Sequence, residues 1–552
     1  MPIHPAVAAR LDRLTPDQRQ AATAPPGPIL CVAPAGSGKT TTLVARIAWL
    51  VDGGVPPAAI SAITFNKRAA EELSERLDQA LGSIGLAPGS VRVRTFHALG
   101  REILRDGGVS VENLIDRSAL LAELWPEAPP GEYGRLDTAF SRLKLDLAVE
   151  VADIRADPEA GATARAFVEY EAALRAREGL DFDDLVRQAL DRLGSDEQLL
   201  GSWRAQCAHL LVDEVQDVDR SQLRLALLLA QPANRIFLVG DDDQSIYGWR
   251  LADVRRVLSL GVSLPGLRRV DLEVNHRCPG PVVERAVALI EHNRERFAKV
   301  IRARPGAPGW IVLAPDGADE PGRSVRILRS WPDDDGTRAI LARTNRELRP
   351  AVVAALTLGL PFRAPSVELL VEDARLDELL DWIDVSTDPA RPLLRRIACL
   401  RRSLPGTDAA GRSLAEAMLG WAPPYCDLPA FRAALKATRT RLIELRRDDA
   451  RLSLATAHST KGAEFDHVAV VGMDVGRFPS GRAVAESSEP HRAMEEERRL
   501  GYVAWTRARR SLTLSYDPVS PSPFLLEAFS PTELGLQGTP PLAMSGRGSP
   551  PG

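Results

Sequence analysis

Short apolar runs separated by longer segments with helical spacing are the main pattern along this chain. Residues 27–33 (GPILCVA) form one such run, followed by a glycine-rich turn and then by TTLVARIAWLV, in which apolar residues recur with the 3.6-residue period of a helix. Two further runs end at Asp213-Glu214 and at Val239-Gly240, the latter directly before three aspartates. The pattern predicts buried strands that each end in a turn carrying small or acidic residues.

Other parts of the chain show helical spacing without such runs. Residues 105–200 have a helical pattern rich in arginine, and residues 373–450 contain short amphipathic segments such as ARLDELLDWIDV, separated by turns rich in proline and glycine. Beyond Phe529 the composition becomes rich in Pro, Gly and Ser, so we predict a disordered tail at residues 531–552.

Composition places the chain among ordinary globular proteins. With 552 residues it is too long for one hydrophobic core, and roughly three or four domains are expected. The charged fraction is 26% and the apolar fraction 45%. The N-terminus lacks an apolar segment of signal-peptide length, and no window approaches the roughly 18 apolar residues of a membrane span. We therefore expect a cytoplasmic protein without a membrane partner.

Charge and cysteine content narrow the classes further. A net charge of −4 and a pI near 6.2 exclude a generally basic surface, so a nucleic-acid partner would need a local basic groove. The five cysteines include no Cys-x-x-Cys pair, and we expect small buried side chains instead of disulfides, zinc or iron–sulfur ligands.

Lysine is scarce, because only six of the 70 basic residues are lysine. A lysine should persist where a compact ammonium is needed and a planar guanidinium would not fit. The six are Lys39, Lys67, Lys144, Lys299, Lys436 and Lys461.

The glycine-rich turn after the first apolar run predicts a phosphate site. Residues 36–40 (GSGKT) close the P-loop pattern, although Ala33 stands where that motif has its first glycine. Small residues let backbone N–H groups surround a phosphate at a helix N-terminus, while Lys39 reaches the β- and γ-phosphates and Thr40 binds Mg²⁺. We predict that ATP and Mg²⁺ are the cofactors.

Acidic and basic residues elsewhere supply the remaining chemistry of ATP hydrolysis. Asp213, at the end of a predicted strand, is a candidate ligand of Mg²⁺, and Glu214 is a candidate base for the attacking water. Arg277 and Arg507 are candidates for stabilising charge on the γ-phosphate. By itself, in so arginine-rich a chain, the pattern favours a surface or ion-paired arginine at each position.

The segment VGDDDQSIYGWR, residues 239–250, combines acids, an amide, aromatic rings and a cation. One interpretation is a capped turn after a buried strand, with the aromatic residues in the core. The other is a functional loop, and this segment alone leaves both open.

Eleven segments in order carry a resemblance to a known family: LTPDQRQA, APAGSGKT, ITFNKRAAEEL, VRTFHALGREIL, LDFDDL, LLVDEVQDVDRSQ, VGDDDQSIYGWR, LEVNHRCPG, ARTNRE, ATAHSTKGAEFDHV and EEERRLGYVAWTRA. Together they resemble UvrD/Rep/PcrA-type superfamily 1 DNA helicases. The match runs from about Leu14 to Phe529.

The resemblance implies an α/β fold with two RecA-like P-loop NTPase domains, ATP between them, and helical insertions. The implied domains are 1–104 with 201–270, 271–372 with 451–530, and the insertions 105–200 and 373–450. It also implies ATP-dependent 3′→5′ movement on single-stranded DNA.

The resemblance assigns roles to individual residues. Catalytic roles fall on Glu214, Arg277, Arg507 and the γ-phosphate sensor Gln244. Nucleotide contacts fall on Gln18, Ala35, Gly36, Ser37, Gly38, Lys39, Thr40, Thr41, His276, Lys461 and Glu464, and metal binding on Thr40 and Asp213. DNA contacts fall on Phe65, Asn66, Thr95, His97, Tyr247, Trp249, Arg250 and His458. Stacking on Trp249 would contribute roughly 1–3 kcal/mol per base without regard to sequence.

The chain departs from the family pattern in three places. His276 replaces the usual tyrosine that stacks on adenine, which predicts weaker and pH-sensitive nucleotide binding. The insertion at 373–450 is much shorter than in relatives, and DPVSPSPFLLEAF replaces an aromatic-tipped hairpin. Both parts that handle duplex DNA are therefore reduced.

Three hypotheses follow. The first is a 3′→5′ single-stranded DNA translocase and helicase in DNA repair or replication-associated processing. It would act as a monomer or weak oligomer. A duplex junction is a possible substrate, and a protein partner is possible for loading or unwinding. The second is an ATP-gated single-strand clamp, or a protein-displacing translocase without robust solitary unwinding. The third, a small-molecule phosphotransferase, leaves Trp249 and the DNA-track motifs without a purpose.

Overall fold

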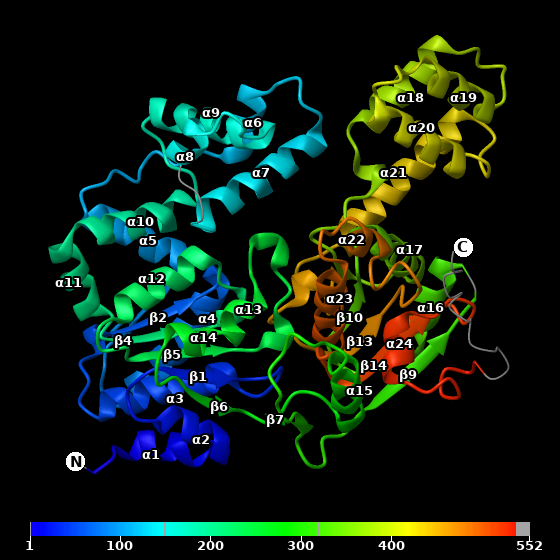
Figure 1. Ribbon diagram of the computed structural model, residues 1–552. Coiled ribbons are helices and arrows are strands. Elements are labelled where there is room, and N and C mark those ends of the chain that lie inside the picture. Colours follow the sequence, from blue (N-terminus) through cyan, green and yellow to red (C-terminus); the bar gives the residue numbers. More distant parts are fainter. Residues whose placement is uncertain (1, 148–150, 318, 537–552) are drawn as a thin grey trace, which may run out of the picture. The chain divides into compact units, whose positions relative to one another are not determined.

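The computed structural model describes residues 2–147, 151–317 and 319–536 (Figure 1). Its chain divides into two compact units. Unit 1 comprises the residues up to Ala307 together with His491–Tyr502, and unit 2 comprises Pro308–Pro490 and the residues from Val503 onward. The chain therefore returns to unit 1 late in the sequence.

A six-stranded, entirely parallel sheet forms the centre of unit 1, with the strand order β3-β2-β4-β5-β1-β6. The strands are β1 Ile29–Val32, β2 Ile60–Thr64, β3 Arg92–Thr95, β4 His209–Val212, β5 Ile236–Gly240 and β6 Arg268–Asp271. The four inner strands are buried along their whole length, whereas β3 and β6 at the edges are partly exposed. Burial on both faces explains why these strands appear in the sequence as continuous apolar runs.

Helices cover both faces of this sheet, because successive strand residues point to opposite sides. Ile29 and Cys31 face a core formed with α1 Pro5–Asp12, α2 Pro16–Thr23, α3 Lys39–Asp52 and α4 Lys67–Gly82. Leu30 and Val32 face the opposite core, which includes α5 Phe96–Asp106, α10 Asp184–Ser195, α11 Glu197–Gln206, α12 Arg220–Ala230, α13 Val254–Leu258 and α14 Leu260–Ser263.

The remaining short elements of unit 1 lie around residues 274–303. They are β7 Val274–Asn275, which pairs in parallel with β8 Arg302–Ala303, and α15 Gly280–Ile290.

A separate group of helices follows α5 (Figure 1). It consists of α6 Arg117–Leu124, α7 Pro130–Leu145, α8 Val151–Ala156 and α9 Ala162–Ala176. These helices share a small core that includes Phe140, Phe167 and Tyr170. The helical character predicted for residues 105–200 is therefore present, while α10 and α11, at the end of that range, pack on the sheet.

Buried charges join this helical group to α10. Lys144, near the end of α7, places its Nζ 2.9 Å from Asp181 Oδ2, 2.8 Å from Asp184 Oδ2 and 2.9 Å from Glu171 Oε1. Burial alone would lower the pKa of Lys144, but the carboxylates more than offset this and raise it. The lysine is therefore held as a cation inside the protein.

Unit 2 contains a second entirely parallel sheet, with the strand order β11-β12-β10-β13-β14-β9. The strands are β9 Trp310–Pro315, β10 Arg338–Ala342, β11 Phe362–Arg363, β12 Leu452–Thr456, β13 Phe465–Val470 and β14 Ala508–Tyr516. The helices of this unit are α16 Glu320–Ser330, α17 Arg349–Leu358, α22 Gly481–Ala485 and α24 Pro523–Ala528, while most of α23 Pro490–Trp505 belongs to unit 1. The two parallel sheets with flanking helices confirm the predicted α/β class.

Between β11 and β12 the chain forms the four helices α18 Arg375–Ser386, α19 Leu393–Ser403, α20 Ala409–Trp421 and α21 Leu428–Leu445. Their apolar side chains are continuous with the core that covers the second sheet. This part of the chain is thus a compact helical extension of unit 2.

The end of the described chain differs from the prediction. After β14 the backbone turns into α24, and Leu534 is buried with its carbonyl oxygen accepting a hydrogen bond from the Tyr516 hydroxyl at 3.1 Å. The disorder predicted for residues 531–536 is therefore wrong, because a single leucine anchors a segment whose average composition is polar. Residues 537–552 of that prediction lie outside the described residues. No helix in the described ranges is long and apolar enough to span a membrane.

Substituting Lys144 tests the buried junction. Lys144→Met leaves three carboxylates without their shared ammonium, so we expect the free energy of unfolding to fall by about 3–5 kcal/mol. The measurement is urea denaturation followed by circular dichroism. Lys436→Met is the matched control, because Lys436 is exposed on α21 and its loss should change stability by less than ~0.5 kcal/mol. Equal urea midpoints for both variants would contradict the assignment.

Candidate functional site

The glycine-rich turn of unit 1 runs from β1 into α3 and has the backbone that a phosphate loop needs. Gly36 and Gly38 have φ values of +69° and +84°, in the left-handed region. A Cβ on Gly36 would lie 2.6 Å from Asn275 Oδ1, and one on Gly38 would lie 2.6 Å from Gln18 Nε2. Both positions therefore require glycine for conformation and for space.

Gln18 lies against this loop. Its Nε2 donates a hydrogen bond to the Ser37 carbonyl oxygen at 2.8 Å, and its Oε1 accepts one from the Thr15 backbone N–H at 3.1 Å. Gln18 is therefore part of the capping box at the start of α2 and also lies against the nucleotide loop.

The carboxylates after β4 face the P-loop lysine. Lys39 Nζ lies 3.4 Å from Glu214 Oε2, and Glu214 adopts a left-handed backbone with φ of +52°. Such a conformation costs of order 1–3 kcal/mol and is concentrated at functional sites. Gln216 donates from Nε2 to the same Glu214 carboxylate. The left-handed backbone of Glu214 and the hydrogen bonds from Lys39 and Gln216 therefore hold its carboxylate toward the P-loop.

Asp213 lies beside Glu214 and is 8% exposed. Its burial, together with the charge of Glu214, raises its pKa to about 7. A buried carboxylate beside Glu214, which itself contacts the P-loop lysine, fits a cation that would restore its ionised form, and oxygen ligands of this kind suit Mg²⁺, which retains several waters. The residues Thr40 and Asp213 therefore fit the metal that the sequence predicted.

The loop after β5 contains a short 3-10 helix, Asp242–Gln244. Gln244 is buried, and its Nε2 donates to Asp241 Oδ2 at 2.6 Å. The Asp241 backbone N–H donates to Gln216 Oε1 at 3.0 Å. Gln244 is therefore connected through Asp241 and Gln216 to Glu214.

The segment after β7 also lies on the P-loop. The His276 backbone N–H donates to the Gly36 carbonyl oxygen at 2.8 Å. Asn275 Oδ1 accepts from the backbone N–H groups of Arg277 and Cys278, both at 2.8 Å. His276 and Arg277 are thereby held at the nucleotide loop, although they are remote from it in the sequence.

The candidate nucleotide residues of unit 2 form their own group. Arg507 is 1% exposed, and its Nε donates to the Val503 carbonyl oxygen at 2.8 Å, while NH1 donates to the Ala463 carbonyl oxygen at 3.2 Å. Ala463 lies between Lys461 and Glu464, in the loop that joins β12 to β13. His458 begins a short 3-10 helix in this loop, and burial with the nearby charges of Arg343 and Lys461 lowers its pKa to about 4.

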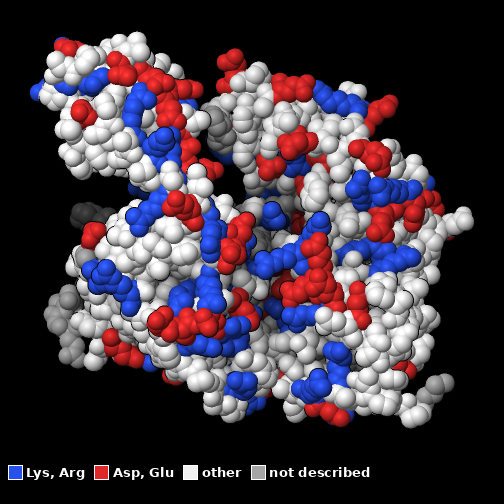
Figure 2. All heavy atoms as spheres, turned by 180° about the vertical axis from the view of Figure 1, so that it is seen from behind, with Lys and Arg blue, Asp and Glu red and all other residues white. Residues whose placement is uncertain are grey.

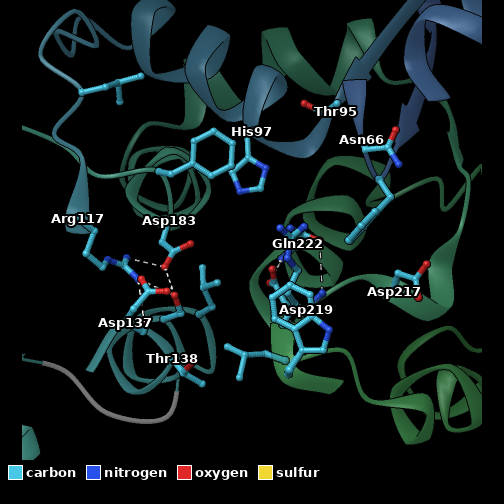
Figure 3. Close-up of a pocket in the computed structure, with 18 of the residues that line it drawn as sticks. Asn66, Thr95, His97, Arg117, Asp137, Thr138, Asp183, Asp217, Asp219 and Gln222 are labelled. Carbon is cyan, nitrogen blue, oxygen red and sulfur yellow. Dashed lines mark hydrogen bonds and ion pairs between the residues drawn. The ribbon is translucent and has the colours of Figure 1, made fainter. Parts of the chain in front are cut away.

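A second site in unit 1 is a cavity of about 840 Å³ (Figure 3). Predicted DNA residues in its lining are Phe65, Asn66, Thr95, His97, Trp249 and Arg250. Tyr247 stacks on Phe65 with ring centroids 5.2 Å apart and meets Trp249 edge-on at 6.1 Å. The structure therefore brings seven of the eight predicted residues together, while His458 lies in unit 2.

Trp249 is 57% exposed, which excludes the alternative that it is a core residue. The guanidinium carbon of Arg250 lies 4.8 Å from the Trp249 ring centroid. Asn66 and Thr95 cap α4 and α5, accepting from the Ala69 N–H at 2.9 Å and the Ala98 N–H at 3.2 Å. Two helix N-termini, which favour anions, therefore begin at this cavity.

Phe182 is a lining residue to which the sequence motifs assigned no role. Its side chain is 61% exposed and stacks on His97 with ring centroids 3.9 Å apart. Burial lowers the pKa of His97 to about 4, so the pair stacks as neutral rings. An aromatic residue enclosed by aspartates in LDFDDL was the available signal, because such flanks are unusual for a core position.

The charges around the cavity are unevenly distributed. Arg117 on α6 holds two carboxylates of the lining, Asp137 on α7 at 3.1 Å and Asp183 directly before α10 at 2.6 Å (Figure 3). Lys67 and Arg250 lie among the other lining residues. Basic and acidic side chains are intermixed on the face in Figure 2, as the small net charge predicted. Any affinity for anions is therefore confined to particular positions, such as the N-termini of α4 and α5, and does not extend over the whole face.

Comparison with known proteins gives consistent matches. The family model of the UvrD/REP helicase N-terminal domain matches residues 14–264, and that of the UvrD-like helicase C-terminal domain matches residues 431–518. DNA helicase II of Escherichia coli K12 is 28% identical over 92% of this chain and 85% of its own length. ATP-dependent DNA helicase UvrD2 of Mycobacterium tuberculosis is 30% identical over 91% of this chain and 78% of its own length. ATP-dependent DNA helicase Rep of Escherichia coli K12 is 28% identical over 91% of this chain and 90% of its own length.

The ionisation of His276 gives a test of the nucleotide site. Partial burial and the charge of Arg304 lower its pKa below the usual 6.5, so the neutral form of the ring predominates at pH 7. We expect a midpoint below pH 6.5 in an NMR titration of the imidazole signals. Nucleotide affinity that depends on this ring should change below pH 6.5 in the native chain and not in His276→Tyr. A midpoint at or above 6.5 would contradict the environment described.

Proposed function

The chain belongs to the UvrD/Rep family of DNA helicases, and from that premise we propose that it moves 3′→5′ on single-stranded DNA by hydrolysing ATP and unwinds duplex DNA in repair or replication-associated processing. The observation that carries the proposal is the loop of residues 241–250. At one end Gln244 is linked through Asp241 and Gln216 to Glu214, and at the other end Trp249 lines the cavity. One short loop thus touches both candidate sites.

The geometry of unit 1 supports the proposed nucleotide roles. Lys39 and the loop amides bind the phosphates, and Glu214 accepts the proton of the attacking water. Thr40 and Asp213 would hold Mg²⁺, which neutralises charge on the phosphates when it is bound. Gln18 and His276 would contact adenine. Arg277 stabilises charge that develops on the γ-phosphate.

Arg507, Lys461 and Glu464 of unit 2 are proposed to contribute to the same reaction, on the evidence of the family motifs in which they stand. Their mutual proximity within unit 2 supports this assignment.

The lining of the cavity supports the proposed DNA roles. Phe65, Tyr247, Trp249 and Phe182 offer ring faces, on which any base can stack. The N-termini of α4 and α5 would bind backbone phosphates, while the carboxylates of Asp137 and Asp183 disfavour phosphates on the opposite wall. A motor that must pass every base needs this indifference to sequence.

Steady-state ATP hydrolysis with oligo-dT of increasing length is the experiment that tests the proposal. We expect turnover to rise with length and then level, because a motor that walks and dissociates at the strand end spends longer on a longer strand. Stimulation that is flat beyond the binding footprint would identify a clamp, and no stimulation would overturn the DNA assignment.

Glu214→Gln should lower turnover by at least about 100-fold while ATP binding persists.

Phe182→Ala tests the stacking face that the sequence did not reveal. Loss of one stacking ring should weaken oligo-dT binding by roughly 1–3 kcal/mol, about 5- to 150-fold, as measured by fluorescence anisotropy at fixed salt. Trp310→Ala is the control. Trp310 is an aromatic residue of unit 2, and like Phe182 it is exposed, with 47% of its surface accessible. Equal effects of the two substitutions would remove Phe182 from the DNA site.

A further inference from the structure

Lys299, to which neither site assigns a role, lies in a buried cluster that joins the nucleotide site at Asp241. Its side chain has no exposed surface, and its Nζ is 3.1 Å from Asp241 Oδ1 and 2.9 Å from Asp243 Oδ2, with Asp242 Oδ1 also in contact. The three carboxylate side chains are equally inaccessible. One ammonium group therefore contacts three consecutive carboxylates inside the protein.

The residues before Lys299 complete the surroundings of these aspartates. Arg296 donates from Nε to Asp243 Oδ1 at 2.9 Å and from NH2 to Asp243 Oδ2 at 2.8 Å. The Phe297 backbone N–H donates to Asp242 Oδ2 at 2.8 Å. Burial alone would lower the pKa of Lys299, but the carboxylates more than offset this and raise it. Both cations are therefore retained in the interior, where they neutralise most of the carboxylate charge.

The cluster is continuous with the loop that carries both candidate sites. Asp241 uses Oδ1 for Lys299 and Oδ2 for the side-chain amide of Gln244 at 2.6 Å. A single carboxylate thus connects the buried lysine to the γ-phosphate sensor. Farther along, the Gly248 backbone N–H donates to Glu496 Oε1 at 2.9 Å, directly before Trp249.

The segment that carries Lys299 is itself anchored to α23. Asn293 Oδ1 accepts from Arg498 NH1 at 2.6 Å, and Glu295 Oε2 accepts from Arg492 Nε at 2.9 Å. These contacts lie within unit 1. The helix α23 therefore holds the segment that carries Lys299 and also contacts the loop at Gly248, so both partners of the cluster share one support.

A lysine fits this position and an arginine does not. An ammonium is a compact centre with three donors that can point to three carboxylates, whereas a guanidinium is a plane whose donors fork in two directions. Lys144, the other lysine that contacts three carboxylates, holds the segment around Phe182 in the same manner. In a chain with only six lysines, two stand where one ammonium must meet three acids.

We propose that Lys299 is the positioning residue that makes the loop of residues 241–250 rigid, so that Gln244 and Trp249 move as one body and DNA at the cavity controls ATP turnover. Lys299 touches neither ligand and acts through Asp241 and its neighbours. The inference rests on the proposed function, because it specifies how the two ligands communicate.

Lys299→Arg is the first test, with three measurements on the full chain. These are the KM for ATP, the Kd for fluorescein-labelled oligo-dT, and kcat with saturating oligo-dT. We expect KM and Kd to change by less than about 3-fold, since the P-loop and the stacking rings remain. The DNA-stimulated kcat should fall by about 10-fold or more, because small misplacements of a catalytic group have large effects on rate. Lys436→Arg, at an exposed position, is the control and should match the native chain.

A second variant separates positioning from stability. Lys299→Met combined with Asp242→Asn removes one charge of each sign, so the net charge of the cluster is unchanged while the Lys299–Asp241 contact is lost. Thermal melting monitors folding. We expect this variant to fold and to retain ATP and oligo-dT binding, with stimulation lost as in Lys299→Arg. Native-like stimulation in either folded variant would overturn the proposal. Failure of both variants to fold would make Lys299 a stability residue alone and would overturn it equally.

The same experiment distinguishes the two levels of inference. If oligo-dT does not stimulate the native chain, the proposed function fails, whatever Lys299 does. If the native chain is stimulated and the variants are stimulated to the same extent, only the positioning role fails.

Discussion

The need to neutralise carboxylates inside unit 1 governs the arrangement of both candidate sites. Asp181 and Asp184 flank the segment of Phe182, and Asp241, Asp242 and Asp243 precede Gln244. An unpaired buried charge would be prohibitively unstable, so each acidic group requires a cation from a distant part of the chain. Lys144 and Lys299 supply those cations, and each thereby ties a functional loop to a different supporting element.

Parallel strands explain why the ligand-binding residues converge. In a parallel sheet the loops at the carboxyl ends of neighbouring strands meet along one edge, which places the P-loop after β1 beside Glu214 after β4 and Asp241 after β5. The loop of residues 241–250 begins at this edge with buried aspartates and ends with the exposed ring of Trp249. Burial at one end and exposure at the other are what a loop needs in order to sense a nucleotide and contact a polymer.

Much of the nucleotide site was predictable, because it depends on local sequence. Glycines followed by Lys39 and Thr40, and an apolar run ending in Asp213-Glu214, specify their own backbone and place their own side chains. The aromatic cluster around Phe65 and Trp249 was also predictable, though only through the ordered motifs of the family. The aspartates around Phe182 marked it as unusual for a core residue, but its stacking on His97 was not predictable, since it depends on two segments that meet only in the folded chain. The tail prediction failed for residues 531–536 because average composition does not register one anchoring residue, Leu534.

The sequence by itself determined the α/β class, the phosphate loop, the acidic pair and the family, because each is encoded in residues that are close together or in a fixed order. It also marked lysine as unusually scarce. Only the tertiary structure decided what Lys144 and Lys299 do, because their partners lie 27–40 and 56–58 residues away and are identified by distance in space. The sequence shows which side chains are charged, but only the folded structure shows which charges are paired with one another.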